Sequence, residues 1–348
     1  MVPGAPREEE DGPLRVVRFR YFPSRFETLA HGAIIENLRS RRWSWLQVVP
    51  FLLAEAFALR RLVREHRPDV LHIHWILPQG AVALLTARAV PWLVTTLGGD
   101  VYALRNPLAI RLKRMVVRRA RAVTTMNSDM RDRLVAIGAP ATTTHVMPMG
   151  ADVDAVRSAA AGIAPVPGRL LFVGRLVEKK GLVVLLDALR MIPAGVTWSL
   201  DIVGDGPLRA RLETAAQGLP VRFLGQLGRD ELSRSLGASS VVVVPSVPAA
   251  SGDQDGLPVA LLEAMAVGRP AVGSRLSGID DAIVDGETGL LVPPGDVGAL
   301  ATALEKLLTD GTLRSTLGAA ASRRAESFSV SSIGRRYTSL LDEVRTAR

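Results

Sequence analysis

Two acidic residues bracket the start of a predicted helix, in a pattern that suits ligand binding. Asp255 stands directly before a helix that Pro258 opens, where the amides from Gly256 to Val259 are free to face an anion. Glu263 follows two turns later, roughly 12 Å along the helix axis at about 1.5 Å per residue. Carboxylates this far apart cannot share a metal ion or a proton, but they suit two hydroxyl-bearing parts of an extended ligand. The alternative is a helix-capping Asp255 and an unrelated, exposed Glu263.

A second candidate site carries cations. Gly174 and Arg175 end a predicted strand, and Lys179, Lys180 and Gly181 lead into the next predicted helix. A guanidinium group offers a planar fork of donors and an ammonium group offers a point charge, so the pair suits a diphosphate. Charged loops at strand ends are common, and this signal alone is compatible with a solvated turn.

Histidines mark the end of an early strand. His72 and His74 alternate along it and therefore share one face. A metal site would need a third ligand, and the other three histidines are scattered along the sequence. We interpret His72 as a buried structural residue, and His74, nearer the carboxyl end of the strand, as the ligand-binding candidate. Further on, Gly98, Gly99 and Asp100 end another predicted strand in a glycine turn that carries a carboxylate.

Several other chemistries are excluded by missing residues. The 348 residues include no cysteine, which rules out disulfides, thiolate metal sites and a cysteine nucleophile. Gly204-Asp205-Gly206-Pro207 lacks the third glycine of a dinucleotide-binding fingerprint. The sequence contains no P-loop, HExxH or G-x-S-x-G motif.

Positive charge is concentrated in the first half of the chain. Residues 1–150 hold 22 Lys and Arg against 12 Asp and Glu, whereas residues 151–348 hold 21 against 22. The densest basic run, Arg111–Arg121, lacks the interleaved aromatic residues that stack on nucleic-acid bases, so nucleic acid is the least favoured partner. A solvated helix face and contact with an anionic membrane surface remain as alternatives.

The sequence contains no signal-peptide core. The longest apolar stretch, residues 45–59, is interrupted by polar residues and is shorter than the ~20 residues that a spanning helix needs. We therefore predict a cytoplasmic protein, with the inner face of the membrane as an alternative location.

Short apolar runs alternate with amphipathic stretches, a pattern typical of parallel α/β units. The predicted fold is α/β, with two doubly wound Rossmann-like domains that face each other across a cleft. We expect an acceptor-side domain over residues 1–154, a donor-binding domain over 155–327 and a closing helix over 328–348. The boundary is set in residues 155–168, which are rich in small residues, Pro and Gly and lack periodicity. The predicted strands lie at residues 15–20, 70–73, 92–96, 122–126, 145–147, 170–173, 198–203, 221–224, 241–244, 271–273 and 290–292.

In this order, the motifs resemble a family. HxHW at 72–75, Gly174-Arg175 with Lys180-Gly181, Asp255-x7-Glu263 with EAMAxGxP, and the glycine-rich segment 278–296 resemble a family 4 retaining nucleotide-sugar glycosyltransferase of GT-B fold. The resemblance runs from about Leu14 to the end of the chain. It implies transfer of a sugar from a nucleoside-diphosphate sugar to a lipid, glycan or small-molecule acceptor, with retention of anomeric configuration.

The resemblance also implies roles for single residues. Arg175 and Lys180 would clamp the donor diphosphate beside Gly174, and Glu263 would bind the ribose hydroxyls. Asp255 would bind sugar hydroxyls with the help of amides near Gly256 and Leu257, and His74 would face the donor sugar. The family requires no metal or other cofactor, and the last helix would cross back onto the first domain.

The sequence departs from the family at several positions. Asp255 replaces a glutamate, Leu97 stands where histidine is common, and Pro148-Met149-Gly150 replaces Pro-Asn-Gly. The first strand, glycine loop, helix and second strand of the family have no counterpart, so we expect an incomplete first domain with unpaired sheet edges and low stability or activity. This leaves a second hypothesis, a weakly active or non-catalytic paralogue that binds nucleotide sugar. A nucleotide-sugar isomerase of the same fold fits these carboxylates and histidines less well.

Overall fold

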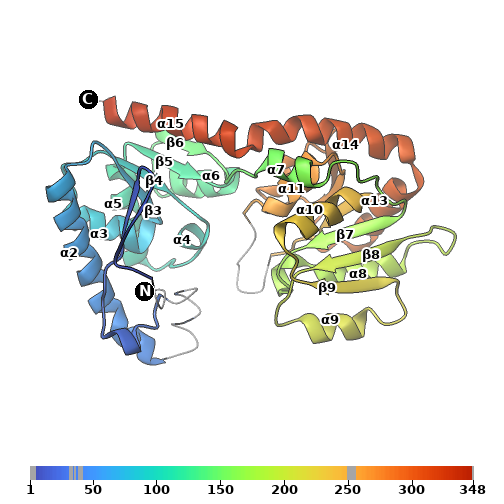
Figure 1. The fold of residues 1–348 in the computed structure, drawn as a ribbon, viewed down its shortest axis with the longest axis horizontal. Coiled ribbons are helices and arrows are strands. Elements are labelled where there is room, and N and C mark those ends of the chain that lie inside the picture. Colours follow the sequence, from blue (N-terminus) through green and yellow to red (C-terminus); the bar gives the residue numbers. More distant parts are fainter. Residues whose placement is uncertain (1–4, 31–33, 35–36, 38–41, 249–255, 347–348) are drawn as a thin grey trace.

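The structure is a computed structural model that describes residues 5–30, 34, 37, 42–248 and 256–346. Two α/β lobes lie side by side, and the last helix runs along one side of the first lobe (Figure 1). Each lobe is built on a parallel sheet, and the predicted pair of doubly wound domains is confirmed.

The first lobe contains a four-stranded parallel sheet in the order β3-β4-β5-β6. One apolar cluster joins helices to one face of this sheet and includes Ala83, Trp92, Val94, Val116 and Val117. The strands are β3 Leu71–His74, β4 Trp92–Thr95, β5 Ala122–Thr125 and β6 Thr144–Val146, and the helices are α2 Val48–His66, α3 Ala81–Thr86, α4 Gly99–Tyr102, α5 Pro107–Arg119 and α6 Ser128–Ala136.

The strand predicted at residues 15–20 does not join this sheet. Residues Leu14–Val17 form β2, which pairs antiparallel with β1, Glu8–Asp11, in an exposed hairpin that the sequence analysis missed. Opposite charges hold the hairpin together: Arg15 donates to Glu8 at 2.8 Å, and Arg18 donates to Glu9 at 2.7 Å. An all-acidic strand carries no apolar pattern, and for that reason the period-2 criterion could not detect it.

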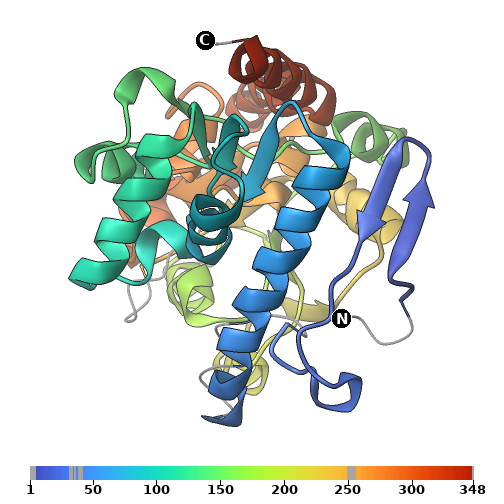
Figure 2. The same cartoon turned by 90° about the vertical axis from the view of Figure 1, so that its left-hand side faces the viewer.

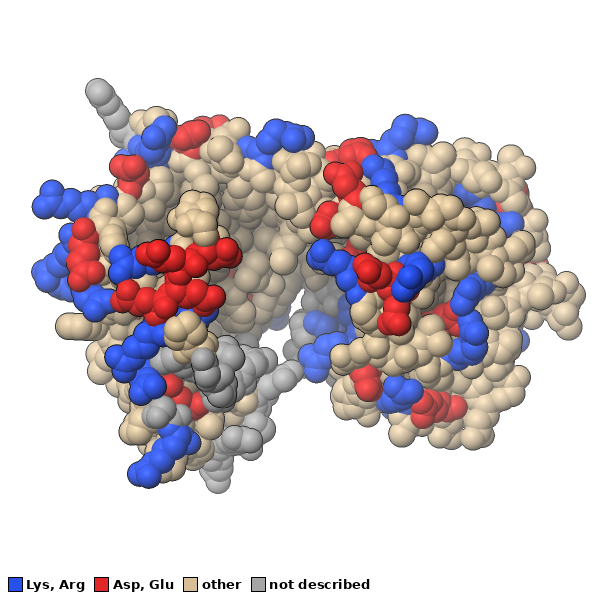
Figure 3. Space-filling view, in the orientation of Figure 1, with Lys and Arg blue, Asp and Glu red and all other residues tan. Residues whose placement is uncertain are grey.

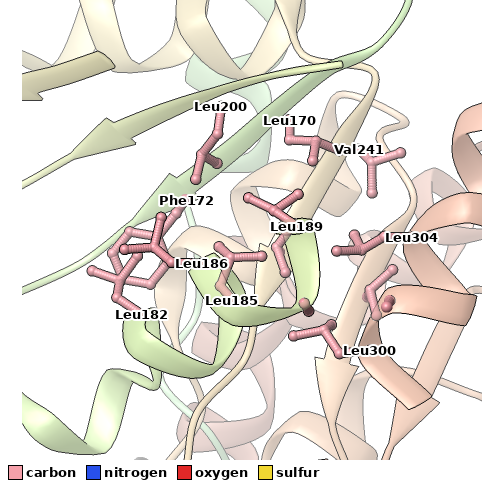
Figure 4. Packing of buried hydrophobic residues seen from close by; sticks show 14 of the residues in the cluster. Leu170, Phe172, Leu182, Leu185, Leu186, Leu189, Leu200, Val241, Leu300 and Leu304 are labelled. Carbon is pink, nitrogen blue, oxygen red and sulfur yellow. The ribbon is translucent and has the colours of Figure 1, made fainter. Parts of the chain in front are cut away.

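The second lobe contains a six-stranded parallel sheet in the order β12-β11-β10-β7-β8-β9. Leu170, Phe172, Leu200 and Val241 pack against leucines of two helices on one face (Figure 4). A second buried cluster, which includes Val242, Leu261 and Met265, lies on the other face. The strands are β7 Arg169–Val173, β8 Ser199–Val203, β9 Val221–Gly225, β10 Val241–Val244, β11 Ala271–Ser274 and β12 Gly289–Val292, and the helices are α7 Val153–Ala159, α8 Leu182–Arg190, α9 Arg209–Ala215, α10 Arg229–Ala238, α11 Val259–Ala266, α12 Ile279–Ala282, α13 Val297–Thr309 and α14 Gly311–Ala325.

The segment between the lobes is more ordered than its composition predicts. Residues Val153–Ala159 form helix α7, capped by Asp152, whose carboxylate accepts the amide of Ala155. Val153 and Val156 are buried in the second lobe. Small residues without a clear period can still form a helix when tertiary packing buries them. The domain boundaries themselves stay a prediction.

The last helix, α15 (Val330–Thr346), packs on the first lobe. Its Ile333, Leu340 and Val344 are buried against Leu93 and Met147. The Arg121 guanidinium donates to the carbonyl of Val344 at 2.8 Å. This helix therefore covers the sheet face opposite α2, α3 and α5 (Figure 1).

Candidate functional site

The loop that carries the predicted cations is attached to its neighbours by backbone hydrogen bonds. After β7, the amide of Gly174 donates to Val203 at the end of β8, and the amide of Leu176 donates to Asp205. Arg175, between them, is exposed, and Lys180 is half-buried. Loops at the carboxyl ends of adjacent parallel strands meet at one edge of the sheet, where ligands bind in doubly wound folds.

The same loop contacts the segment that leads to α11. Val247, shortly after β10, donates its amide to the carbonyl of Lys179 at 2.9 Å. Gly181 has a φ of +66°, and a Cβ atom there would lie 1.8 Å from the carbonyl oxygen of Pro245. Only glycine allows this approach. Backbone contacts thus join the loop that carries Arg175 and Lys180 to the chain just after β10.

The start of α11 also contacts the loop after β11. Gly278 has a φ of +97°, and a Cβ atom there would lie 2.0 Å from the carbonyl oxygen of Gly256. Helix α11 begins at Val259, so Pro258 occupies the position before the helix rather than the predicted first turn. Gly256 and Leu257 lie at this junction, whereas Asp255 lies outside the described residues.

Glu263 lies on the second turn of α11 and is half-buried. Burial raises the pKa of its carboxyl group, and the positive charge of Arg229 opposes this shift. Arg229 opens α10, directly after β9. Glu263 therefore lies within reach of the charge of Arg229 at the start of α10.

The first lobe meets this edge directly. A Cβ atom on Gly256 would lie 3.7 Å from Cβ of Met126, which directly follows β5. The amide of Ser128 donates to Asp281 at 3.0 Å, its hydroxyl donates to the same carboxylate at 2.5 Å, and the amide of Asp129 donates to the Ser277 hydroxyl at 3.0 Å. Figure 3 shows an open cleft between the two lobes.

These contacts involve residues that the sequence analysis missed. Asn127 caps α6, because its side chain accepts the amide of Met130. Ser128 instead binds Asp281 across the lobes. The glycine-rich segment 278–296 was a sequence signal for this region, but nothing in the sequence paired Asp281 with Ser128.

The two histidines lie as an adjacent pair at the end of β3. Their ring centroids are 4.4 Å apart, His74 is exposed, and His72 is half-buried with Nε2 2.7 Å from the Thr95 hydroxyl. Burial, assisted by the charge of His74, lowers the pKa of His72 to about 4, so His72 is neutral at physiological pH. The assignment of His72 as structural agrees with these contacts, and the role of His74 stays a prediction.

Asp100 turns inward. Its carboxylate accepts the amides of Ile76, Leu97 and Gly98 at 2.9–3.1 Å and so joins the loops after β3 and β4. Burial raises its pKa, and the hydrogen bonds from these amides oppose that shift. The Asp100 carboxylate therefore stabilises the conformation of the glycine turn after β4.

The basic run Arg111–Arg121 is only partly a surface feature. Lys113 is buried and donates to the carbonyls of Val101 and Ala103. Arg119 bonds the carbonyl of Val90, and Arg121 bonds α15. A run of cations in sequence points around a helix in all directions, and here four of the six, Arg114 included, donate to backbone carbonyl groups. Arg111, Arg114 and Arg118 are exposed.

Neither a cluster of metal ligands nor a membrane-spanning helix occurs in the described residues. Within the described ranges, no three His, Asp or Glu side chains come together as metal ligands. In the same ranges, no helix combines the length and the apolar character needed to cross a bilayer.

Both halves of the chain match known domain families. Residues 2–150 match the family described as "Glycosyl transferase 4-like domain", and residues 167–310 match "Glycosyl transferases group 1". The amylovoran biosynthesis glycosyltransferase AmsK of Erwinia amylovora is 40% identical over 180 residues, which are 50% of this chain and 44% of AmsK. The sulfoquinovosyl transferase SQD2 of Arabidopsis thaliana is 29% identical over 344 residues, which are 92% of this chain and 65% of SQD2. The chain thus spans about half to two thirds of the length of these relatives.

Solved structures share the fold. Sucrose-phosphate synthase from Thermosynechococcus elongatus superposes with a TM-score of 0.76 at 23% identity, over 99% of this chain and 87% of that one. Anabaena HepE, solved in complex with UDP, superposes with a TM-score of 0.69 at 20% identity, over 83% and 82% of the two chains. With two doubly wound lobes meeting at their strand ends and a matching family for each lobe, the chain belongs to the glycosyltransferases of the GT-B fold.

Proposed function

We propose that the chain transfers a sugar from a nucleoside-diphosphate sugar to a lipid, glycan or small-molecule acceptor, with retention of anomeric configuration. The observation that carries this proposal is the backbone connection between the cation loop and the segment before α11, through Val247 to Lys179 and through Gly181 against Pro245. The cation loop meets the chain after β10 there, at the strand ends where doubly wound folds bind ligands.

The donor diphosphate is bound by Arg175 and Lys180. The backbone of Gly174 and the amides at Gly256 and Leu257 border the same space. A helix start favours an anion through its free amides, and the cations neutralise the charge that develops on the departing nucleotide.

The two acidic residues bind the hydroxyl groups of the donor. Glu263 accepts hydrogen bonds from the ribose, and Asp255 accepts them from the sugar. The eight-residue spacing of the two carboxylates, about 12 Å along a helix, supports this division, because ribose and sugar lie on opposite sides of the diphosphate. No metal or other cofactor takes part in the proposed reaction.

In the transfer step, the bond between the anomeric carbon and the diphosphate oxygen breaks, and a bond from the acceptor oxygen forms on the same face. The acceptor proton passes to the departing phosphate oxygen, so atoms and charge balance. His74 faces the sugar and orients it, without bonding to the anomeric carbon.

The relatives suggest which donors to test first. HepE has been solved with UDP and with UDP-glucose. UDP, GDP and ADP, with their sugar conjugates, form the first thermal-shift panel, because a ligand that binds only the folded state raises the melting temperature.

Lys180→Ala and Glu263→Gln should each weaken binding of the donor that this panel identifies. Removing a charged hydrogen-bonding group costs about 1.5–3 kcal/mol, or about tenfold to a hundredfold in Kd. Isothermal titration calorimetry measures the change. Lys306→Ala and Glu287→Gln, at exposed positions, are the matched controls and should leave Kd unchanged. Unaltered donor affinity in both test variants would contradict the assignment.

Turnover and stereochemistry separate an enzyme from a protein that only binds the donor. His74→Ala should lower kcat more than it changes KM, because His74 acts on the bound sugar. NMR of the product should show the donor's anomeric configuration. Donor binding without transfer to any member of an acceptor panel would favour the non-catalytic alternative, and an inverted product would refute retention.

A further inference from the structure

Helix α2 carries one straight stripe of exposed side chains on its outer face. Val49, Leu53, Phe57, Arg60 and Arg64 follow one another at spacings of four, four, three and four residues. At about 100° per residue they lie on a single line. The stripe, called here the α2 stripe, is about 22 Å long, apolar at its start and cationic at its end.

The apolar half of the α2 stripe is unusually exposed. Trp45 and Leu46 precede it in the short turn Arg42–Gln47, and the five apolar side chains, from Trp45 at 61% to Phe57 at 75%, are all mostly solvent-accessible. The opposite side of the helix is well packed, with Phe51 buried against Tyr21 and Leu29. The exposure is therefore not a sign that the helix lacks a core to pack on.

Two neighbouring helices extend the same surface. Helix α3 contacts both α2 and α5, and all three helices pack their inner faces on one side of the sheet, so their outer faces point the same way (Figure 2). Outward from this layer point Leu85 of α3 and Leu108 and Met115 of α5, all exposed, with Arg111 and Arg118 beside them.

The charges of this surface are nearly all positive. Helix α5 contains no acidic residue. On α2, Glu55 lies off the stripe and is half-buried, and Glu65 pairs with Arg61 at 3.6 Å, also off the stripe. The acidic β1–β2 hairpin lies on the Arg61 side: the hydrogen bond from Arg15 lowers the pKa of Glu8, and the charge of Arg61 adds a smaller contribution. Arg60 and Arg64 are thus the cations that lie in line with the apolar residues.

We propose that this outer face of the first lobe docks on an anionic lipid bilayer. Trp45, Leu46, Val49, Leu53 and Phe57 enter the interface between headgroups and acyl chains. Arg60 and Arg64, with the arginines of α5, bind the phosphate-rich headgroups. A cationic helix with an aromatic and aliphatic face has the chemistry of an interfacial anchor.

Charge disfavours a second copy of the chain as the occupant. In an antiparallel pairing of two α2 stripes, Arg60 and Arg64 of each copy would lie on the apolar half of the other. The stripe offers no carboxylate there, so both guanidinium groups would lose water without gaining a partner.

Vesicle co-sedimentation of the full chain tests the proposal. We expect binding to vesicles of phosphatidylcholine with phosphatidylglycerol, and at least tenfold weaker binding to phosphatidylcholine alone. Leu53→Gln with Phe57→Gln should weaken the first interaction by on the order of tenfold or more, because both side chains lose their apolar burial. Arg60→Gln with Arg64→Gln should remove most of the preference for anionic lipid, at about fivefold per arginine.

Matched controls come from the second lobe and from α15. Met191→Gln and Val330→Gln alter exposed apolar residues away from the α2 stripe and should bind vesicles like the parent chain. Thermal denaturation checks that every variant is folded. Since the changed side chains are exposed, the melting temperature of each variant should equal that of the parent chain. Donor affinity, measured separately, should also hold, so this test is independent of the proposed transfer reaction.

Three outcomes would overturn the proposal. One is no binding to anionic vesicles by the parent chain. Another is binding that the α2 variants leave unchanged. The last is a dimer in light scattering that Leu53→Gln with Phe57→Gln dissociates, which would make a second copy the occupant.

Discussion

Burial decides the protonation of several ionisable residues in this protein. Burial raises the pKa of Glu263, lowers that of His72 to about 4 and raises that of Glu55 to about 7. Glu55 is the clearest case, because its Oε2 atom is buried with no hydrogen-bond partner among the described residues. Opposite charge or hydrogen bonds would stabilise a buried carboxylate, and Glu55 gains neither from the described part of the chain.

Glu55→Gln should make the protein more stable at pH 8. The pKa of Glu55 is raised from 4.5 to about 7 in the folded state, so folding favours the protonated form. The resulting penalty is absent below about pH 4.5, grows as the pH rises to about 7 and is complete above it. Glutamine resembles the protonated acid and avoids the penalty. Thermal denaturation from pH 4.5 to pH 8 should show matching melting temperatures at the acidic end and a higher one for the variant at pH 8.

The control for this prediction lies on the same helix. Glu65→Gln removes an exposed carboxylate whose pair with Arg61 is solvent-accessible, and such pairs contribute little. Its melting temperature should follow the parent chain across this range. If the melting temperature of Glu55→Gln also matched that of the parent chain at pH 8, ionisation of Glu55 would not destabilise the folded protein.

Helix α15 is joined to the first lobe by polar as well as apolar contacts. The Tyr337 hydroxyl lies 3.2 Å from that of Thr124 and 3.5 Å from that of Thr95, and Thr95 bonds His72 in turn. The chain of hydroxyl groups links three strands to a helix more than 200 residues later in the sequence. It fixes the register in which α15 lies across the strands.

Tyr337→Phe should lower the free energy of unfolding by about 1 kcal/mol, the net value of a partly buried hydrogen bond. The aromatic ring and its packing stay, so the change isolates the hydroxyl. Urea-induced unfolding, followed by circular dichroism, measures it. Thr338→Ala, an exposed hydroxyl one residue on, is the control and should not lower stability. A Tyr337→Phe variant as stable as the parent would show that this network does not anchor the helix.

Polar contacts between the start of α6 and the loop after β11 join the two lobes. Asp281 accepts the amide and the hydroxyl of Ser128, and Arg324 donates to the carbonyl of Asp281. The loop that carries Asp281 also touches the start of α11 through Gly278. One loop therefore contributes both to the contact between the lobes and to the position of the candidate donor site.

Asp281→Ala should loosen the two lobes. Removing both hydrogen bonds from Ser128 leaves the start of α6 with its hydrogen bonds to Ser277 but without Asp281, so the lobes should sample wider separations. Small-angle X-ray scattering should show a larger radius of gyration. Asp280→Ala is the control, because within the described chain this neighbouring carboxylate makes no hydrogen bond to the first lobe. Equal scattering from both variants would show that the remaining contacts hold the lobes together.

The order of most strands and helices can be predicted from the sequence alone. Apolar runs such as Val241–Val244 have few alternatives to a buried parallel strand, and the order of strands and helices then predicts two doubly wound lobes. The motifs around Gly174, Lys180 and Glu263 likewise predict a donor site at the ends of the strands, because the carboxyl ends of parallel strands meet at one edge, and this assignment stays a prediction.

Contacts between distant segments determine which side chains lie at those loops and which stabilise the fold, and these contacts are seen only in the structure. Asp281 and Ser128 are 153 residues apart, and no local pattern pairs them. The basic run Arg111–Arg121 looked like one surface, but packing turned Lys113 inward and left Arg118 outside. On α2, the same periodicity that predicts a helix cannot say that part of its apolar side stays uncovered. Direction, burial and long-range pairing depend on contacts between distant segments, and local periodicity carries no information about them.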